Sequence, residues 1–173
     1  MRRIETTRFI LRDFCEEDLE DLYAYAKVDG IGEDAGWNHH KNIEESKRVL
    51  QHFLNVGDVY AIVWKENNKV IGSLGVHQCI DKEAREIGYV LSKDYWGMGI
   101  MTEAVAVVIR DLFNNTELKR LYCEYFLGNT RSKRVMEKNN FHFKKAYKRN
   151  INGQGREIMQ YVLEREEFYD KNS

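Results

Sequence analysis

Two glycines stand two residues apart in the segment YWGMGIMTEAV, which spans residues 95–105. The segment follows a run typical of a strand and leads into a run typical of a helix. Gly97 and Gly99 would let the backbone turn sharply and let a ligand approach it closely. The first N–H groups of a helix lack partners within it, so with the helix dipole they favour an anion such as phosphate. Ordinary tight turns use the same spacing, and the turn alone leaves both interpretations open.

Polar residues before this turn could carry out proton transfer. Glu86 lies in the strand-like run REIGYVLS, and His77 lies near the end of the preceding strand-like run. A carboxylate can act as a general base through a water molecule, and the pKa range of histidine suits the same task. Each residue also has a structural interpretation, as a solvated glutamate paired with Lys or Arg and as a structural histidine.

The elements that must position these residues alternate between strands and helices. The run from residue 59 to 92 predicts an antiparallel meander, and the strand–helix–strand unit around residue 100 predicts a right-handed parallel crossover. We therefore expect one α/β domain over residues 1–173 with a mixed sheet. Strands are predicted at 4–14, 59–65, 70–80, 85–92, 118–126, 141–151 and 156–166, helices at 15–28, 42–55, 101–115 and 129–140, and a loop at 29–41.

The composition excludes several classes of protein. With 43% hydrophobic and 32% charged residues and a net charge of −1, the chain has the profile of a soluble globular protein and lacks the basic excess of a nucleic-acid binder. No apolar run approaches the ~18 residues of a membrane helix, and the N-terminus lacks the apolar stretch of a signal peptide. Cys15, Cys79 and Cys123 are far apart and form no Cys-x-x-Cys motif. We therefore expect a cytoplasmic protein with no metal site, nucleic-acid partner or membrane partner.

Three motifs taken together resemble the GNAT family of acetyl-CoA-dependent N-acetyltransferases. They are EIGYVLSKDYWGMGIMTEAV, the later NTRSKRVMEKNNF and the opening TTRFILRDF. The resemblance covers essentially the whole chain and is greatest to the Rim-type branch, which acetylates the N-termini of ribosomal proteins. It implies an α+β fold with a mixed, mostly antiparallel central sheet, whose splayed central strands are flanked by helices. It also implies acetyl-CoA as the cosubstrate.

The resemblance implies a binding site for the cofactor. Backbone N–H groups from Gly97 to Thr102 would hold the diphosphate, and the pantetheine arm would pair with the main chain of Val90 and Leu91 as an added strand. The Leu91 N–H would face the thioester oxygen, and Asn129 would bind the pantetheine, cap the following helix, or do both. The predicted cofactor-binding residues are Val90, Leu91, Trp96, Gly97, Met98, Gly99, Ile100, Met101, Thr102 and Asn129.

The resemblance also suggests how the catalytic roles are divided. Glu86 is the implied base, with His77 as its rival. Many relatives donate a proton to the departing thiolate from a tyrosine in the last helix, where this chain has Met136. In the Rim-type branch the serine of the N-x-x-S motif is the proposed acid, so Ser132 is our choice and Tyr125 the alternative. Cys123 is interpreted as a core residue, because direct transfer needs no acyl-enzyme.

The acceptor is less well defined by the sequence. Glu33, Asp34 and Trp37 occupy the predicted loop and, with His77, are candidate acceptor contacts, since acids suit a cationic amine. An ordinary solvated loop is the alternative. We expect the acceptor to be a protein N-terminal α-amine. The alternatives are a polyamine or aminoglycoside, or a catalytically silent acetyl-CoA-binding module, and the protein would be a monomer or homodimer.

Two departures from the family pattern concern structure. Asp94 replaces the Gln or Arg often found three residues before Gly97, a change that the Rim-type branch tolerates. Asn140 replaces the glycine that ends the last helix before Phe141. Asn is the next best residue for a left-handed helix cap, so we expect the fold to survive this change.

Overall fold

The computed structural model of the protein describes residues 1–170. Its contacts divide the chain into two compact units. The first comprises Met1–Gly75 with Tyr89–Ile100, and the second comprises Val76–Gly88 with the residues from Met101 onward. Strands β4 (Val70–Gln78) and β5 (Ala84–Leu91) therefore contribute residues to both units.

The first unit is built from a small antiparallel sheet and helices packed on it. Its core gathers residues from α1, α2, α3 and β3 around Leu22 and Leu50, and Ile10, Val90 and Trp96 pack against that core. The unit contains β1 (Ile4–Glu5), β2 (Phe9–Asp13), α1 (Leu19–Ala26), α2 (Ile31–Ala35), α3 (Ile43–Val56), β3 (Val59–Trp64), most of β4 (Val70–Gln78) and the end of β5 (Ala84–Leu91).

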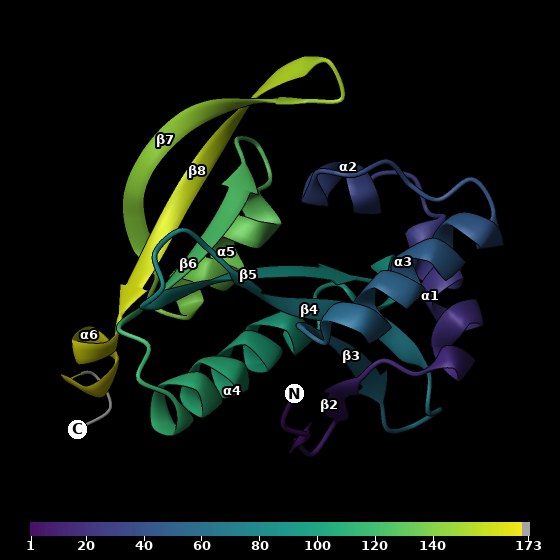
Figure 1. The fold of residues 1–173 in the computed structure, drawn as a ribbon, viewed down its shortest axis with the longest axis horizontal. Helices are drawn as coiled ribbons and strands as arrows, with labels where there is room; N and C mark the ends of the chain where they lie inside the picture. Colours follow the sequence, from purple (N-terminus) through teal and green to yellow (C-terminus); the bar gives the residue numbers. More distant parts are fainter. Residues whose placement is uncertain (171–173) are drawn as a thin grey trace. The chain divides into compact units, whose positions relative to one another are not determined.

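The second unit is dominated by a long hairpin of β7 (His142–Ile151) and β8 (Gln154–Glu164) beside β6 (Arg120–Phe126) (Figure 1). The hairpin turns at Asn152 and Gly153, which both have a positive φ. The unit contains α4 (Ile100–Asn115) from Met101 onward, and it contains β6 (Arg120–Phe126), α5 (Thr130–Lys138), β7 (His142–Ile151), β8 (Gln154–Glu164) and α6 (Arg165–Asp170).

The strands follow the hydrogen-bonded order β1-β2-β3-β4-β5-β6-β8-β7. All pairs with a resolved register are antiparallel except β5 and β6, which are parallel and joined through α4. The predicted mixed, mostly antiparallel sheet and the parallel pairing of the crossover are therefore confirmed, while the right hand of the crossover stays a prediction. The single domain expected over residues 1–173 stays a prediction.

Three local expectations were wrong. The strand expected at 4–14 is broken, because the Thr6 hydroxyl accepts hydrogen bonds from the backbone N–H groups of Arg8 and Phe9 and forms a turn there. The loop expected at 29–41 contains the short helix α2. The final strand gives way at residue 165 to α6, which was not expected.

Asn140 behaves as the cap that the sequence predicts. Its φ is +64°, and the backbone N–H of Phe141 donates to the carbonyl of Met136 at 3.1 Å. This left-handed residue ends α5 and lets the chain enter β7. Within residues 1–170, no helix is long and apolar enough to cross a membrane.

Candidate functional site

The turn between β5 and α4 needs its two glycines for their backbone conformation. Gly97 has a φ of +80° and Gly99 a φ of +73°, in the left-handed region that side chains disfavour. A Cβ atom at Gly97 would meet nothing within 4 Å, and one at Gly99 would meet only Arg8 Nη2, at 4.0 Å. Conformation, and not crowding, therefore explains the glycines, and the surface beside the turn is open.

Two side chains hold this turn in place. The indole Nε1 of Trp96 donates to the carbonyl of Leu91 at 2.9 Å, and Arg8 Nη1 donates to the carbonyl of Met98 at 2.7 Å. Trp96 therefore borders the turn and connects it to the end of β5. Sequence reasoning missed Arg8, because the only signal is its place in the TTRFILRDF motif and its contact lies 90 residues away.

The first turn of α4 offers backbone groups, while two of its side chains are committed to the interior. Ile100 and Met101 are buried, so their backbone amides are what they can present. The Thr102 carbonyl accepts a hydrogen bond from Asn139 Nδ2 at 3.2 Å, which ties the helix start to the end of α5. This arrangement suits an anion held by amides at a helix N-terminus.

The end of β5 lies very close to β4. A Cβ atom at Gly72 would lie 2.4 Å from the Val90 carbonyl oxygen, and the Ser92 N–H donates to the Ile71 carbonyl at 2.8 Å. On its other side, β5 pairs with β6 only from Ala84 to Ile87, although β5 continues to Leu91. This early end of the ladder is what splayed strands require.

Glu86 lies on β5 as a half-buried carboxylate. Within residues 1–170, no side chain donates a hydrogen bond to it. Burial raises its pKa, the negative charge of Glu124 raises it further, and the charges of Arg149 and His77 act in the opposite direction. His77 is close by on β4, since its Nε2 is 3.9 Å from where a Gly88 Cβ would be. Both candidate bases therefore lie in one neighbourhood.

Asn129 and Ser132 meet at the start of α5. The Asn129 side chain caps this helix by accepting the Ser132 N–H at 3.1 Å. The capping role predicted for Asn129 is therefore confirmed, and Ser132 lies in the first turn. Met136 is buried in the same helix.

Tyr125 and Cys123 lie on β6. Burial, followed by a hydrogen bond with Tyr161, raises the pKa of Tyr125 to about 12, so its hydroxyl keeps its proton at neutral pH. The ring centroids of Tyr125 and Tyr161 are 5.7 Å apart. Cys123 is 1% exposed, consistent with its interpretation as a core residue.

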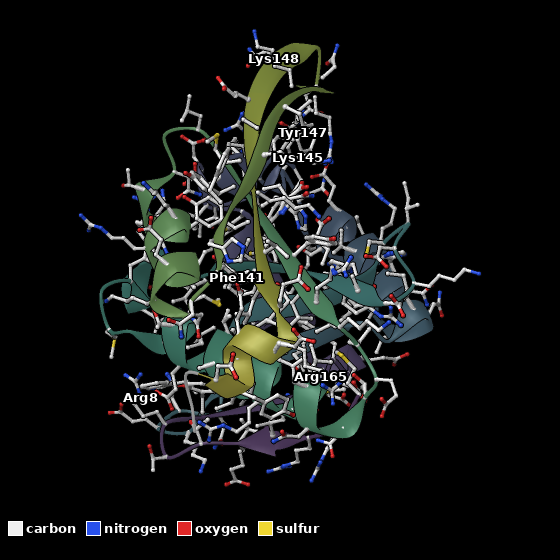
Figure 2. The ribbon with its side chains drawn as sticks, turned by 90° about the vertical axis from the view of Figure 1, so that its left-hand side faces the viewer. Arg8, Phe141, Lys145, Tyr147, Lys148 and Arg165 are labelled. Carbon is white, nitrogen blue, oxygen red and sulfur yellow. The ribbon has the colours of Figure 1, made fainter. Side chains whose placement is uncertain are left out.

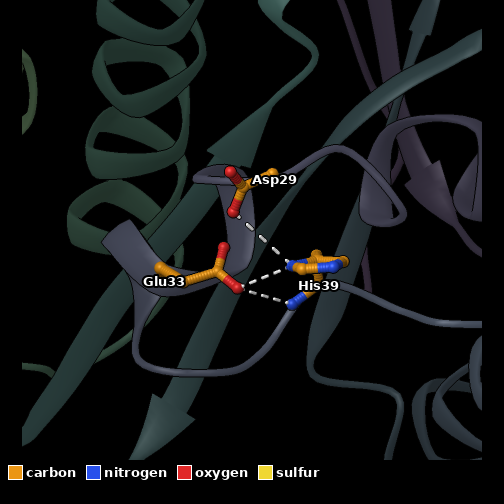
Figure 3. A group of neighbouring side chains, drawn as sticks. All are labelled: Asp29, Glu33 and His39. Atoms are coloured by element: carbon orange, nitrogen blue, oxygen red, sulfur yellow. Dashed lines mark hydrogen bonds and ion pairs between the residues drawn. The ribbon is translucent and has the colours of Figure 1, made fainter.

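Glu33 binds its own segment of chain (Figure 3). Its carboxylate accepts the Gly30 N–H at 2.8 Å and the His39 N–H at 2.9 Å, and it contacts His39 Nδ1 at 2.9 Å. Burial alone would raise the pKa of Glu33, but these hydrogen bonds outweigh it and lower the pKa to about 2. The ionised side chain therefore braces α2, which sequence reasoning did not foresee.

The rest of this segment is also internally braced. The ring of Trp37 packs at a tilt of 45° against that of His40, with 5.1 Å between the ring centroids, and it covers Gly32. Asp34 remains partly exposed. Ligand atoms of Asp29, Glu33 and His39 lie within 4.8 Å of one another, a spacing that a metal ion could bridge. Both Glu33 oxygens already accept N–H groups, however, so the cluster is better explained as part of the brace.

The chain is similar to known N-acetyltransferases in its sequence. The model of the acetyltransferase (GNAT) domain family matches residues 8–142. The uncharacterized N-acetyltransferase YoaA of Bacillus subtilis is 28% identical over 144 residues, which are 80% of this chain and 81% of YoaA.

Solved structures share the fold. A GNAT-family acetyltransferase from Bacillus anthracis superposes with a TM-score of 0.88 and 20% identity, covering 95% of this chain and 99% of that one. RimL, a ribosomal L7/L12 α-N-protein acetyltransferase solved with coenzyme A, superposes with a TM-score of 0.80 and 21% identity, covering 94% and 98%.

Proposed function

Because the chain belongs to the GNAT acetyltransferase family, we propose that it transfers the acetyl group of acetyl-CoA directly to the N-terminal α-amine of a protein. The observation that carries this proposal is the half-buried Glu86, whose carboxylate receives no side-chain hydrogen bond within residues 1–170 and whose pKa is raised. A carboxylate in this state can accept a proton during the reaction.

The cofactor is assigned to the turn and helix already described. Amides from Gly97 to Thr102 would hold the diphosphate, with Trp96 and Met98 bordering it. The main chain of Val90 and Leu91 would pair with the pantetheine arm, and the Leu91 N–H would donate to the thioester oxygen as negative charge develops there. The positive φ of both glycines and the early end of the β5–β6 ladder support this assignment. The residues that we propose to bind the cofactor are Val90, Leu91, Trp96, Gly97, Met98, Gly99, Ile100, Met101, Thr102 and Asn129.

The reaction joins the amine nitrogen to the thioester carbon. As the new C–N bond forms, the C–S bond breaks and its electron pair leaves with sulfur. The amine proton passes through a water to Glu86, with His77 as the rival base, and the thiolate takes a proton from Ser132, with Tyr125 as the alternative donor. Glu33, Asp34 and Trp37 remain the proposed acceptor contacts from α2 and the residues after it, although Glu33 also braces this segment.

An α-amine suits this base better than a lysine side chain does. The pKa of a free α-amine is about 7.7–8.0, against about 10.4 for lysine, so much more of the α-amine is neutral at pH 7. A glutamate with a moderately raised pKa can then complete the deprotonation. The cytoplasmic location and the monomeric or homodimeric state stay predictions.

Thiol release from acetyl-CoA tests the proposal. We expect turnover with peptides that carry a free N-terminus, and none with the same peptides blocked at the N-terminus. Turnover with spermidine or an aminoglycoside, and none with peptides, would assign the enzyme to small amines. Absence of turnover with every amine, despite acetyl-CoA binding, would favour a silent binding module.

The base is tested by Glu86→Gln, with Glu83→Gln as the matched control because Glu83 is exposed just before β5. We expect Glu86→Gln to lower kcat/KM by about a hundredfold at pH 7 and by less at pH 9, where the amine is already neutral. The control should behave as the wild type does. Equal losses at both pH values would argue against a base. In the same assay, unchanged turnover by Ser132→Ala would exclude Ser132 as the acid.

A further inference from the structure

A second carboxylate shares a face of the sheet with Glu86. Glu86 on β5 is the register partner of Tyr122 on β6, and Glu124 lies two residues further along β6. Side chains alternate between the two faces of a strand, so Glu124 lies on the same face as Tyr122 and Glu86. Gln160 on β8 is the register partner of Glu124 and continues this polar row.

Three donors from β7 and β8 converge on Glu124. The hydroxyl of Tyr147 donates to Oε1 at 2.5 Å, and Gln160 Nε2 donates to the same oxygen at 2.8 Å. Arg149 Nη2 is 3.5 Å from Oε2 and also donates to the Tyr147 hydroxyl at 2.7 Å. Figure 2 shows Tyr147 on β7 together with Lys145 and Lys148. The Glu124 side chain is only 12% exposed, so these contacts fix its position.

Glu86 differs from Glu124 in its hydrogen-bond partners. Glu124 has three donors, whereas no side chain within residues 1–170 donates to Glu86. Two neighbouring carboxylates repel each other when both are ionised, so the charge of Glu124 acts on Glu86. Titratable or charged groups near Glu86 come from the β4 end, β6 and β7: His77, Cys79, Tyr122, Glu124, Tyr147 and Arg149.

We propose that Glu124 is a positioning residue for acetyl transfer: a negative charge fixed on β6 that makes Glu86 a stronger proton acceptor. This inference rests on the proposed function, because it assigns Glu86 as the base. Tyr147 and Gln160 hold the Glu124 charge in place, and Arg149 partly offsets it. The Arg149 side chain is 52% exposed, so solvent screens this offset.

The direction of the effect follows from the like charges. The charge of Glu124 is the second largest cause, after burial, of the raised pKa of Glu86. Removing that charge should lower the pKa of Glu86 and weaken it as a base.

The test is the pH dependence of kcat/KM in Glu124→Gln, which keeps the shape and removes the charge. We expect the Glu86 ionisation, which lies below that of the acceptor amine on the acidic side of the profile, to move to lower pH by about half a pH unit or more. The plateau should fall several-fold, with the acetyl-CoA Kd unchanged. Glu157→Gln, which removes an exposed carboxylate from β8, should leave the profile unchanged. An acidic limb in Glu124→Gln that coincides with the wild type overturns the proposal, because a merely structural brace would not move it.

A second variant covers the case in which Glu124→Gln fails to fold. Arg149→Met removes the exposed opposing charge and should move the acidic limb to higher pH. An acidic limb in Arg149→Met that stays in place or moves to lower pH would contradict the proposed effect of the Glu124 and Arg149 charges on Glu86.

A carboxyl NMR titration separates this inference from the proposed function. The Glu86 signal, assigned with Glu86→Gln, should titrate at lower pH in Glu124→Gln even without turnover. Failure of acetyl transfer in the wild type would count against the proposed function. An unmoved Glu86 titration would count against the role of Glu124.

Discussion

Arg8 Nη1 lies 2.7 Å from the carbonyl oxygen of Met98, so a residue next to β2 holds the turn between Gly97 and Gly99. The guanidinium fixes the one carbonyl that lies between the two left-handed glycines. It therefore helps to fix the orientation of the neighbouring amides, which we propose to bind the diphosphate.

Arg8→Ala should weaken acetyl-CoA binding by about tenfold, because a hydrogen bond to a charged group contributes about 1.5–3 kcal/mol and 1.4 kcal/mol corresponds to tenfold in Kd. Isothermal titration measures this change. Arg3→Ala is the control, since Arg3 is exposed and, within residues 1–170, pairs only with Glu5. Equal Kd values for Arg8→Ala and Arg3→Ala would mean that Arg8 does not support the turn.

Features encoded within a few residues could be predicted from the sequence. The glycine turn and the Asn140 cap depend on the local backbone, and the amphipathic runs predicted most helices and strands. The α2 helix was missed because it depends on Glu33 accepting the N–H of His39, six residues away. Arg8 and the Glu124 network were missed because their partners are brought together only by the sheet. Sequence spacing does not report such contacts.

Gly99→Ala should destabilise the fold modestly and also reduce acetyl-CoA affinity. A non-glycine residue at positive φ costs about 1–2 kcal/mol, which lowers the Tm of a chain of this size by about 2–8 °C. Gly57→Ala is a matched control, because Gly57 caps α3 with a φ of +67° and has no atom near its Cβ position. Gly57→Ala should lose stability while keeping full affinity. If both variants bind acetyl-CoA equally well, the turn is not the cofactor site.

Glu86→Gln should be more stable than the wild type at pH 7. The pKa of Glu86 in the folded state is raised above the ordinary 4.5, so its protonated form stabilises the fold below pH 4.5 and this contribution is lost as the pH rises through the folded value. The amide side chain in Glu86→Gln is neutral at every pH, so the variant does not lose this stability as the pH rises. Urea unfolding between pH 4 and 8 should show a stability difference that grows with pH. A difference of constant size would contradict the raised pKa.

Asp18→Asn should destabilise the first unit by about 1.5–3 kcal/mol at pH 7. Asp18 is buried and accepts Arg12 Nη1 at 2.7 Å, Arg12 Nη2 at 2.8 Å and the Cys15 N–H at 2.9 Å. Burial alone would raise its pKa, but these hydrogen bonds and the Arg12 charge outweigh it and lower the pKa below the ordinary 3.8.

The stabilisation from Asp18 is therefore present above pH 3.8 and is lost as the pH falls through the folded value. Urea unfolding at pH 7 and at pH 3 should show a smaller difference between Asp18→Asn and the wild type at the lower pH. Asp13→Asn, at an exposed site on β2, should have little effect at either pH. A deficit of Asp18→Asn that grows on acidification would reverse the assigned sign.

Isothermal titration of the full chain with coenzyme A, dephospho-coenzyme A and pantetheine tests the anion site proposed at the N-terminus of α4. We expect the two ligands that carry the diphosphate to bind with similar affinity, and pantetheine to bind at least about tenfold more weakly, a difference of roughly 1.4 kcal/mol. Pantetheine that binds as tightly as coenzyme A, or coenzyme A that does not bind, would contradict the assignment of the Gly97–Thr102 amides to the diphosphate.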